Sequence, residues 1–160
     1  MTKSFLFLLF FLAGISTGYS QSVPTKIAPF QMRLTTGQQY NYSQLAAGPV
    51  VLIYFSPDCD HCQDFTKDLI KNYNVVANKQ VVMITFQSMD MLKPFVKQHS
   101  LGSYSNFKVG TEGTSYQVQR YYQIRQFPYI AIYDKAGKLV KTYEGEQPHA
   151  QIFKTIKDMK

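Results

Sequence analysis

Two cysteines three residues apart are the residues of this sequence best suited to chemistry. They lie in the segment Cys59-Asp60-His61-Cys62, and the chain has no other cysteine. An apolar, strand-like run precedes them and a helical pattern follows, so both thiols are expected at the start of a helix. Unpaired N–H groups and the positive end of the helix dipole stabilise a thiolate there. The pattern therefore predicts a dithiol that cycles between thiol and disulfide.

The two thiols are expected to have different roles. Disulfide exchange needs one exposed thiolate that attacks a substrate disulfide and a second thiol that resolves the mixed disulfide. Cys59 opens the predicted helix in the more exposed position, so we predict that it is the nucleophile. Cys62 lies one turn further into the helix and is the predicted resolving thiol. The Cys59–Cys62 disulfide is itself the redox centre, and no further cofactor is expected.

Charged neighbours of the cysteines act in opposite directions. An imidazolium at His61 would favour the thiolate form of Cys59 and make the disulfide more oxidising. Asp58 and Asp60 disfavour a thiolate because they place negative charge beside it. The sequence leaves both directions of the redox couple open.

The elements around the cysteines form a strand–helix–strand pattern. Residues 50–55 are an unbroken apolar run, which fits a strand buried on both faces. Residues 56–58 are turn formers, and a helix with an apolar face continues to about residue 74. A second apolar run, residues 81–86, is predicted to lie parallel to the first, with the cysteine helix as the crossover.

The rest of the chain predicts a mixed α/β domain. Further strands are expected at residues 30–34 and 40–42, paired as an N-terminal hairpin, at residues 107–109 on a sheet edge, and at residues 129–133 and 138–143 as a second hairpin. Further helices are expected at residues 90–99, with Pro94 in the opening turn, at residues 114–122, starting from a capping box of Thr114 and Gln117, and at residues 148–159. His99 and His149 are expected at the surface near helix ends.

Composition limits the class of protein. The chain has 160 residues, 45% of them hydrophobic, which suits one domain with a substantial core. Two cysteines cannot form a framework of several disulfides. The net charge of +7 is spread over the chain without a Lys/Arg tract. It predicts a solvated basic surface, with weak attraction to anionic membranes as the alternative, and gives no reason to expect nucleic acid as a partner.

The N-terminus has the pattern of a cleaved signal peptide. Lys3 precedes an apolar run at residues 5–15, which is shorter than the roughly 20 residues of a membrane-spanning helix. Gly18 and Ser20 then place small residues before Gln21. We expect a signal peptide at residues 1–20, a flexible leader at residues 21–29 and one domain at residues 30–160. The domain would then be exported to the periplasm or another extracytoplasmic space, where disulfides persist.

This order of elements resembles the thioredoxin fold over nearly all of residues 30–160. The resemblance rests on Cys59-Asp60-His61-Cys62 after a buried strand and on Gln126-Phe127-Pro128-Tyr129 before the strand of the final hairpin. It implies a cis Phe127–Pro128 bond beside the dithiol and a substrate-binding role for Phe127 and Pro128. The hairpin, the export signal and the insertion at residues 107–122 resemble the TlpA-like extracytoplasmic branch. That branch implies a thiol–disulfide oxidoreductase that acts on protein thiols or disulfides, with a membrane or soluble thiol partner, and we expect a monomer.

The sequence also departs from the thioredoxin pattern. Asp58 stands where a Trp is usual, and the chain contains no Trp. Ile53 occupies the strand position that carries a buried carboxylate in thioredoxin, a group thought to help deprotonate the resolving thiol. Asp64 and Asp68 lie on the cysteine helix and could substitute, although solvated positions suit them better.

Alternative interpretations remain for the cysteine pair. A reductase is favoured by the overall resemblance, whereas a His before the second Cys is found in oxidases and isomerases of this fold. A copper-binding module of the metallochaperone kind could use Cys59, His61 and Cys62, although copper-delivering members space their cysteines one residue wider. A permanent structural disulfide is the simplest alternative, but a helix start suits reactive thiols better.

Overall fold

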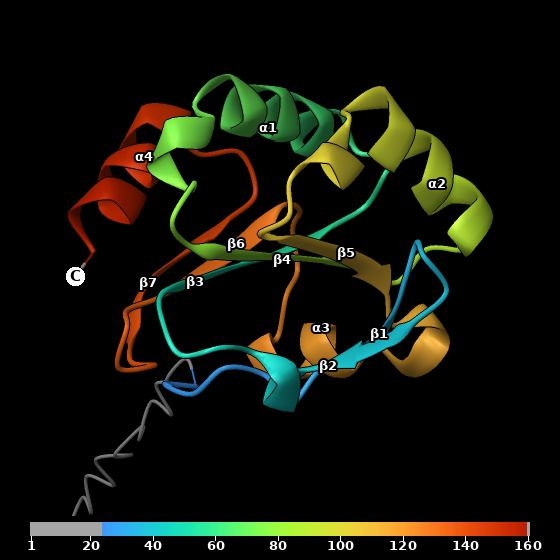
Figure 1. The fold of residues 1–160 in the computed structure, drawn as a ribbon, viewed down its shortest axis with the longest axis horizontal. Helices are drawn as coiled ribbons and strands as arrows, with labels where there is room; N and C mark the ends of the chain where they lie inside the picture. The colour runs from blue at the N-terminus through green and yellow to red at the C-terminus, as the bar shows by residue number, and fades with distance from the viewer. Residues whose placement is uncertain (1–23, 160) are drawn as a thin grey trace, which may run out of the picture.

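A seven-stranded mixed sheet runs through the molecule, and the computed structural model describes residues 24–159 of the chain (Figure 1). In spatial order the strands are β2 (Gln39–Asn41), β1 (Gln31–Leu34), β5 (Phe107–Thr111), β4 (Gln80–Thr85), β3 (Val50–Phe55), β6 (Tyr129–Tyr133) and β7 (Leu139–Glu144). The β3–β4 and β4–β5 pairs are parallel, and the other four pairs are antiparallel.

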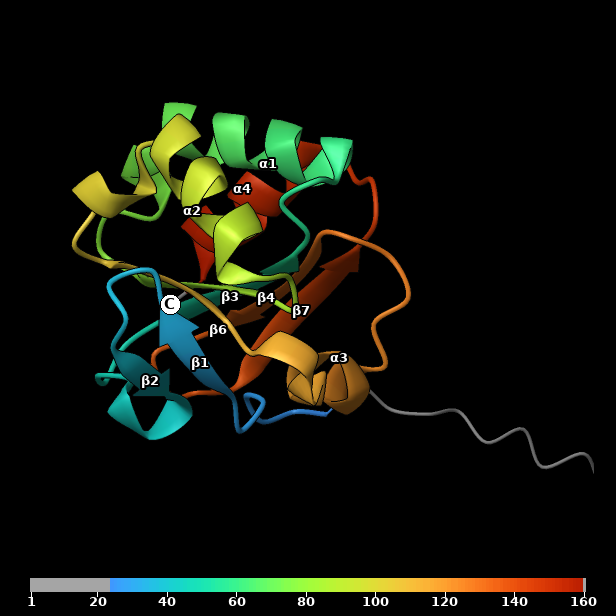
Figure 2. The ribbon, with the colours of Figure 1, turned by 90° about the vertical axis from the view of Figure 1, so that its right-hand side faces the viewer.

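Helices cover both faces of this sheet (Figures 1 and 2). One face carries α1 (Asp60–Lys71), α2 (Met89–Gln98) and α4 (His149–Asp158), and the other carries α3 (Gln117–Tyr122). Each face has its own apolar core, because side chains of the central strands alternate between the two. The predicted fold class, a mixed sheet flanked by helices with an N-terminal hairpin, is confirmed.

The strand and helix that hold the cysteines form for the reasons that the sequence suggests. All six residues of β3 are buried, since β4 and β6 flank the strand and helices cover it. Phe65 and Leu69 are fully buried on the inner face of α1, one helical turn apart. Burying an aliphatic or aromatic side chain of this size contributes about 1.5–3 kcal/mol. This packing fixes the start of α1 at the end of β3.

The strand predicted at residues 107–109 is not on a sheet edge. β5 lies between β4 and β1, because the N-terminal hairpin pairs along its outer side. Leu34 pairs with Gly110 in this register. A Cβ atom at Gly110 would lie 2.7 Å from the carbonyl oxygen of Arg33, so glycine permits the close approach of the two strands.

Two predicted helix starts need correction. The side chain of Ser88 caps α2, so the helix begins at Met89 and Pro94 lies in its second turn rather than its opening turn. The missing N–H of Pro94 leaves the Asp90 carbonyl without its usual helical donor. At the start of α3, the predicted capping box of Thr114 and Gln117 does not form, and the carboxylate of Glu112 instead accepts from the N–H of Val118.

Part of the expected leader is packed against the domain. Ala28 is fully buried, and its N–H donates to the hydroxyl of Tyr122 at 2.8 Å. The carbonyl oxygen of Lys26 accepts from the hydroxyls of Tyr121 and Tyr133, both at 3.1 Å. A flexible leader is therefore the wrong description of residues 26–28.

The predicted signal peptide at residues 1–20 lies outside the described residues. Within residues 24–159, no helix combines the length and the apolar character that crossing a membrane requires.

Candidate active site

The two cysteines meet at the start of α1. Cys59 is the N-cap residue, and its sulfur accepts a hydrogen bond from the N–H of Cys62 at 3.3 Å. Cys59 is partly exposed, whereas Cys62 is 1% exposed, and both are free thiols in this structure. The sulfur of Cys59 therefore occupies the place of an N-cap oxygen, where a helix stabilises negative charge.

Burial sets the protonation of the inner thiol. It raises the pKa of Cys62 well above the ordinary range, and the hydrogen bond with Cys59 raises it further. Ile53 is buried in the same apolar cluster, so the strand position that carries an acid in thioredoxin holds none here. Cys62 is consequently a neutral thiol at physiological pH until its proton is removed.

The loop before Cys59 is held by side chains that follow β3 and β4. The N–H of Cys59 donates to the carbonyl of Ser56 at 3.2 Å. The Ser56 hydroxyl donates to the carboxylate of Asp58 and accepts from the side-chain amide of Gln87 at 3.2 Å. Asp58 is thus fixed beside Cys59 as a hydrogen-bond acceptor in the turn.

Gln63 connects this loop to the end of α2. Its side-chain amide donates to the carbonyl of Pro57 at 2.6 Å, and its side-chain oxygen lies 2.6 Å from Nε2 of His99. His99 is buried, contrary to the surface position predicted for it, and burial lowers its pKa. A neutral His99 ring donates to Gln63, which in turn fixes the turn that leads into Cys59.

The loop before β6 brings the predicted substrate-binding residues beside Cys59. The Phe127–Pro128 bond is cis, as the resemblance implied. The thiol of Cys59 lies 3.9 Å from the carbonyl oxygen of Phe127 and points toward it as a donor. The loop, drawn in orange, rises from α3 to β6 on the side where α1 begins (Figure 2).

The last residue of β7 and the residue that follows it hold this loop in place. The carboxylate of Glu144 accepts from the N–H groups of Arg125 and Gln126, at 2.5 and 2.8 Å. Gly145 donates its N–H to the carbonyl of Pro128 at 3.0 Å, with a φ of 68° that favours glycine. The sequence reasoning missed both residues.

His61, the second residue of α1, contacts the loop after β7. Its described contact is with Glu146 in the loop after β7, where Nε2 lies 3.9 Å from a carboxylate oxygen. Both side chains are largely exposed, so this is a weak surface pair. His61 remains next to Cys62 in the chain, and its partner Glu146 was not identified from the sequence.

The two aspartates considered as substitutes for the buried acid lie on the outer side of α1. Asp64 pairs with Lys67 at 2.9 Å, and that lysine lowers the pKa of the carboxyl. Asp68 lies 2.7 Å from Nδ1 of His149, a half-buried residue that joins α4 to α1. The surface position predicted for His149 is therefore only partly correct, and both carboxylates already have a partner.

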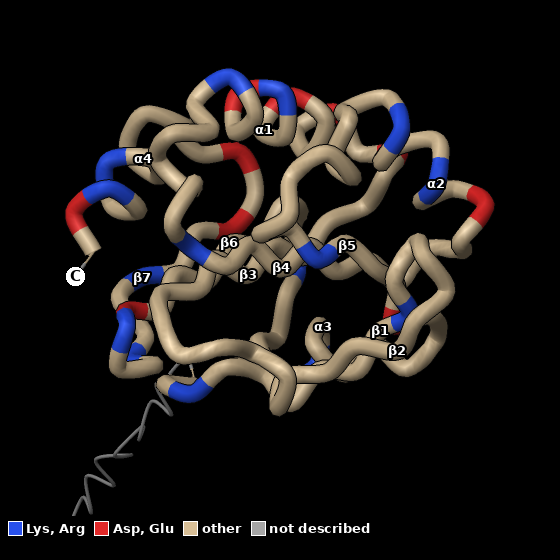
Figure 3. Tube along the Cα trace, viewed as in Figure 1, with Lys and Arg blue, Asp and Glu red and all other residues tan. Residues whose placement is uncertain are grey.

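Charges of both signs lie on α1, which carries Asp60, Asp64 and Asp68 as well as Lys67 and Lys71 (Figure 3). No group of three or more metal-binding side chains occurs within residues 24–159. The arrangement supplies an exposed thiol at a helix start, a buried thiol one turn away and a backbone carbonyl beside them. These are the groups that two-step disulfide exchange requires.

Comparison with solved structures relates this geometry to known proteins. A secreted disulfide oxidoreductase of Mycobacterium tuberculosis shares 16% identity with a TM-score of 0.68, covering 80% of this chain and 94% of its own. A putative protein disulfide isomerase of Bacteroides thetaiotaomicron shares 18% with a TM-score of 0.69, covering 86% and 89%. An exposed lipoprotein thioredoxin of Streptococcus pneumoniae shares 24% with a TM-score of 0.58, covering 81% and 98%. At these identities the likeness shows the fold.

A search of curated proteins found no match. The family model described as a thioredoxin-like domain matches residues 37–160, which include the cysteine pair and the loop with Pro128. The chain therefore belongs to the family of thioredoxin-like domains.

Proposed function

We propose that this protein is an extracytoplasmic thiol–disulfide oxidoreductase that exchanges disulfides with protein substrates through Cys59 and Cys62. The observation that carries the proposal is the unequal placement of the two thiols. Cys59 is accessible, and its sulfur accepts a hydrogen bond from the N–H of Cys62. Cys62 is buried and protonated. Such an arrangement gives one attacking and one resolving sulfur.

In the reducing direction, the thiolate of Cys59 attacks one sulfur of a substrate disulfide. A mixed disulfide forms, and the other substrate sulfur leaves as a thiolate that takes up a proton. Cys62 then loses its proton and attacks the sulfur of Cys59, which releases the second substrate thiolate. Two electrons pass to the substrate, and the Cys59–Cys62 disulfide remains to be reduced by a thiol partner, either in the membrane or soluble.

Phe127 and Pro128 are the proposed substrate-binding residues. The carbonyl of Phe127 lies beside the sulfur of Cys59 and is free to accept from the backbone of a bound peptide once the thiol is engaged. The N–H groups of the two preceding residues, Arg125 and Gln126, are already used to hold the loop, since both donate to Glu144. The substrate would therefore align along the backbone at Phe127.

We assign the protein to the TlpA-like branch and favour the reducing direction. The N-terminal hairpin and the insertion that carries α3 support the branch. The signal-like N-terminus supports export, and one structural neighbour is described as secreted. An oxidase or isomerase is the alternative direction for the same dithiol, since His61 adjoins Cys62.

Substituting each cysteine separately tests the roles assigned to Cys59 and Cys62. Cys59→Ser should abolish reduction of protein disulfides, because it removes the attacking sulfur. Cys62→Ser should accumulate mixed disulfides with client proteins, seen on non-reducing gels and lost on adding dithiothreitol. If the Cys62→Ser protein releases clients as freely as the wild type, the assignment of nucleophile and resolving thiol is wrong.

A further inference from the structure

A row of aromatic rings leads away from the dithiol along the insertion. The ring of Phe127 lies 5.6 Å from that of Phe86, and Phe86 lies 5.7 Å from Tyr116, between ring centroids. Phe86 and Phe127 are half-buried, and Tyr116 is 37% exposed. We call Phe127, Phe86 and Tyr116 the aromatic row. It begins at the residue whose carbonyl faces Cys59 and ends at the start of α3.

Buried groups fix the far end of this row. The ring of Tyr54 packs beneath it, 5.9 Å from Phe127 and 6.2 Å from Phe86. The hydroxyl of Tyr54 donates to Glu112 at 2.7 Å, and the same carboxylate accepts from the N–H of Val118 at 3.0 Å. The segment between Glu112 and Val118 carries Tyr116, so the exposed ring stands on a fixed support.

The backbone at Tyr116 has an unfavourable conformation. Its φ is 46°, in the left-handed region, which is uncommon for a bulky residue. A strained residue persists only where its surroundings determine it. Here the conformation places an exposed tyrosine ring against Phe86 instead of directing it to solvent.

A hollow adjoins the outer end of the row. It has a volume of about 690 Å³ and is lined by Tyr116, Gln119, Arg120, Gln123 and Ile124. Ile124 is buried and supplies apolar surface, and Arg120 is exposed. A guanidinium beside an apolar surface can stack on an aromatic ring.

We propose that the aromatic row and the adjoining hollow bind a large aromatic side chain of the client protein and so select its substrates. This proposal rests on the proposed function, because it continues the surface at which Phe127 would meet the substrate backbone. The two steps of the row span at most about 11 Å, the length of about three extended residues. The selected side chain therefore lies two to four residues from the reactive cysteine of the client.

Model peptides measure this selectivity directly. Each peptide carries one cysteine bonded to thionitrobenzoate, whose release is coloured, and either Phe or Ser at the third residue on each side of the cysteine. The second-order rate constant for reaction with the reduced protein is compared between the two peptides. An added aromatic contact corresponds to a preference of about 2- to 12-fold for the Phe peptide.

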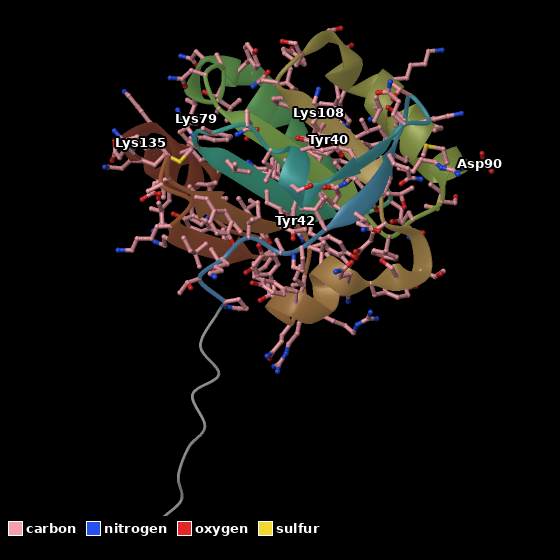
Figure 4. The ribbon with its side chains drawn as sticks, turned by 60° about the horizontal axis from the view of Figure 1, so that its bottom comes forward. Tyr40, Tyr42, Lys79, Asp90, Lys108 and Lys135 are labelled. Atoms are coloured by element: carbon pink, nitrogen blue, oxygen red, sulfur yellow. The ribbon has the colours of Figure 1, made fainter. Side chains whose placement is uncertain are left out.

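Substitutions at the end of the row locate the preference. Tyr116→Asn removes the ring but tolerates the left-handed backbone, so it should fold and abolish the preference. Tyr116→Phe should retain it. Tyr42→Asn is the matched control, because Tyr42 is 46% exposed and follows β2, outside the row (Figure 4). The control should also retain the preference.

Two results overturn the proposal in distinguishable ways. Equal rate constants for the Phe and Ser peptides with the wild type, or a preference that survives Tyr116→Asn, would remove the aromatic row from substrate selection. Reduction of hydroxyethyl disulfide tests the proposed redox function independently of substrate selection, since this disulfide is too small to reach Tyr116. All variants should reduce it at the wild-type rate, and a wild type that reduces neither it nor any peptide would refute both proposals.

Discussion

Cys59 and Cys62 share one turn of α1 but differ in their access to water. The outer sulfur accepts a helix N–H, and the inner thiol is held neutral by burial. This difference follows from position, because Cys59 caps the helix from the preceding loop, whereas Cys62, the third residue of α1, faces the core. The effect of a neighbouring charge on the reduction potential of this pair can be tested by substituting His61.

His61 is expected to tune the redox couple through its charge. His61→Pro removes the imidazole at the second helical position, where proline is tolerated. The potential should become more reducing by about 5–20 mV, the size that a weak surface charge interaction gives. Equilibration of the reduced and oxidised forms in glutathione buffers measures the shift.

Lys71→Gln is the matched control for that measurement. It removes a positive charge from the opposite end of the same helix, more than a Debye length from the dithiol, and should leave the potential unchanged. An identical potential in the wild type and the His61→Pro variant would remove His61 from the mechanism.

At this scale the sequence predicts the reactive groups but not their partners. Cys59, Cys62 and Pro128 are recognisable because their chemistry requires those residue types at those places. Glu144 and Gly145, which hold the loop that carries Pro128, have no local signal in the sequence. They act only because the end of β7 packs against the loop before β6, which depends on the pairing of distant strands.

Among the helices, α1 and α2 are coupled through the side chain of Gln63, which accepts from the side-chain amide of Gln98 at 3.2 Å. Gln63 at the first turn of α1 meets His99 just after α2, and its amide also binds the carbonyl of Pro57. The ring of His99 packs on Phe95, which packs on Phe55 at the end of β3. The end of α2 thereby supports the turn that positions Cys59.

Burial of His99 predicts a pH-dependent stability. Its pKa in the folded state lies below the ordinary 6.5 because burial disfavours the charged ring. The unfolded chain therefore binds a proton more readily than the folded one as the pH falls below about 6.5. The free energy of unfolding should decrease from there down through the folded-state pKa, as urea denaturation at a series of pH values would measure.

His99→Gln provides the comparison. This variant lacks the titrating ring, so its free energy of unfolding should vary less between neutral pH and pH values below the folded-state pKa of His99. Equal pH dependence of the two proteins over that range would contradict the burial of a neutral His99.

The elements themselves were largely predictable, and their ends were less so. Residues 50–55 and 129–133 are strands with the predicted bounds, because continuous apolar runs mark strands that are buried on both faces. α1 ends at Lys71, before the predicted residue 74, because a short 3-10 turn, Tyr73–Val75, follows. The burial of His99 could not be predicted, since it depends on how the end of α2 meets α1.

For the whole molecule, the sheet and its helices bring three distant segments together. The start of α1, the loop before β6 and the insertion before α3 meet at one end of the sheet, where the dithiol and the aromatic row form a continuous surface. The thioredoxin resemblance, read from the order of elements in the sequence, predicts that the start of α1 and the loop before β6 lie together. The role of the insertion depends on Glu112 and Tyr54, whose contact spans 58 positions of the chain and leaves no sequence signal.

The central claim is that Cys59 and Cys62 form a reversible redox couple, and its reduction potential tests this most directly. The mature domain would be equilibrated with thiol buffers and its thiols counted by the mass added on alkylation, since the chain has no Trp to report by fluorescence. We predict one two-electron transition below about −240 mV, in the range of reductases. A pair that no thiol buffer reduces or reoxidises would contradict the account and indicate a structural role for the two cysteines.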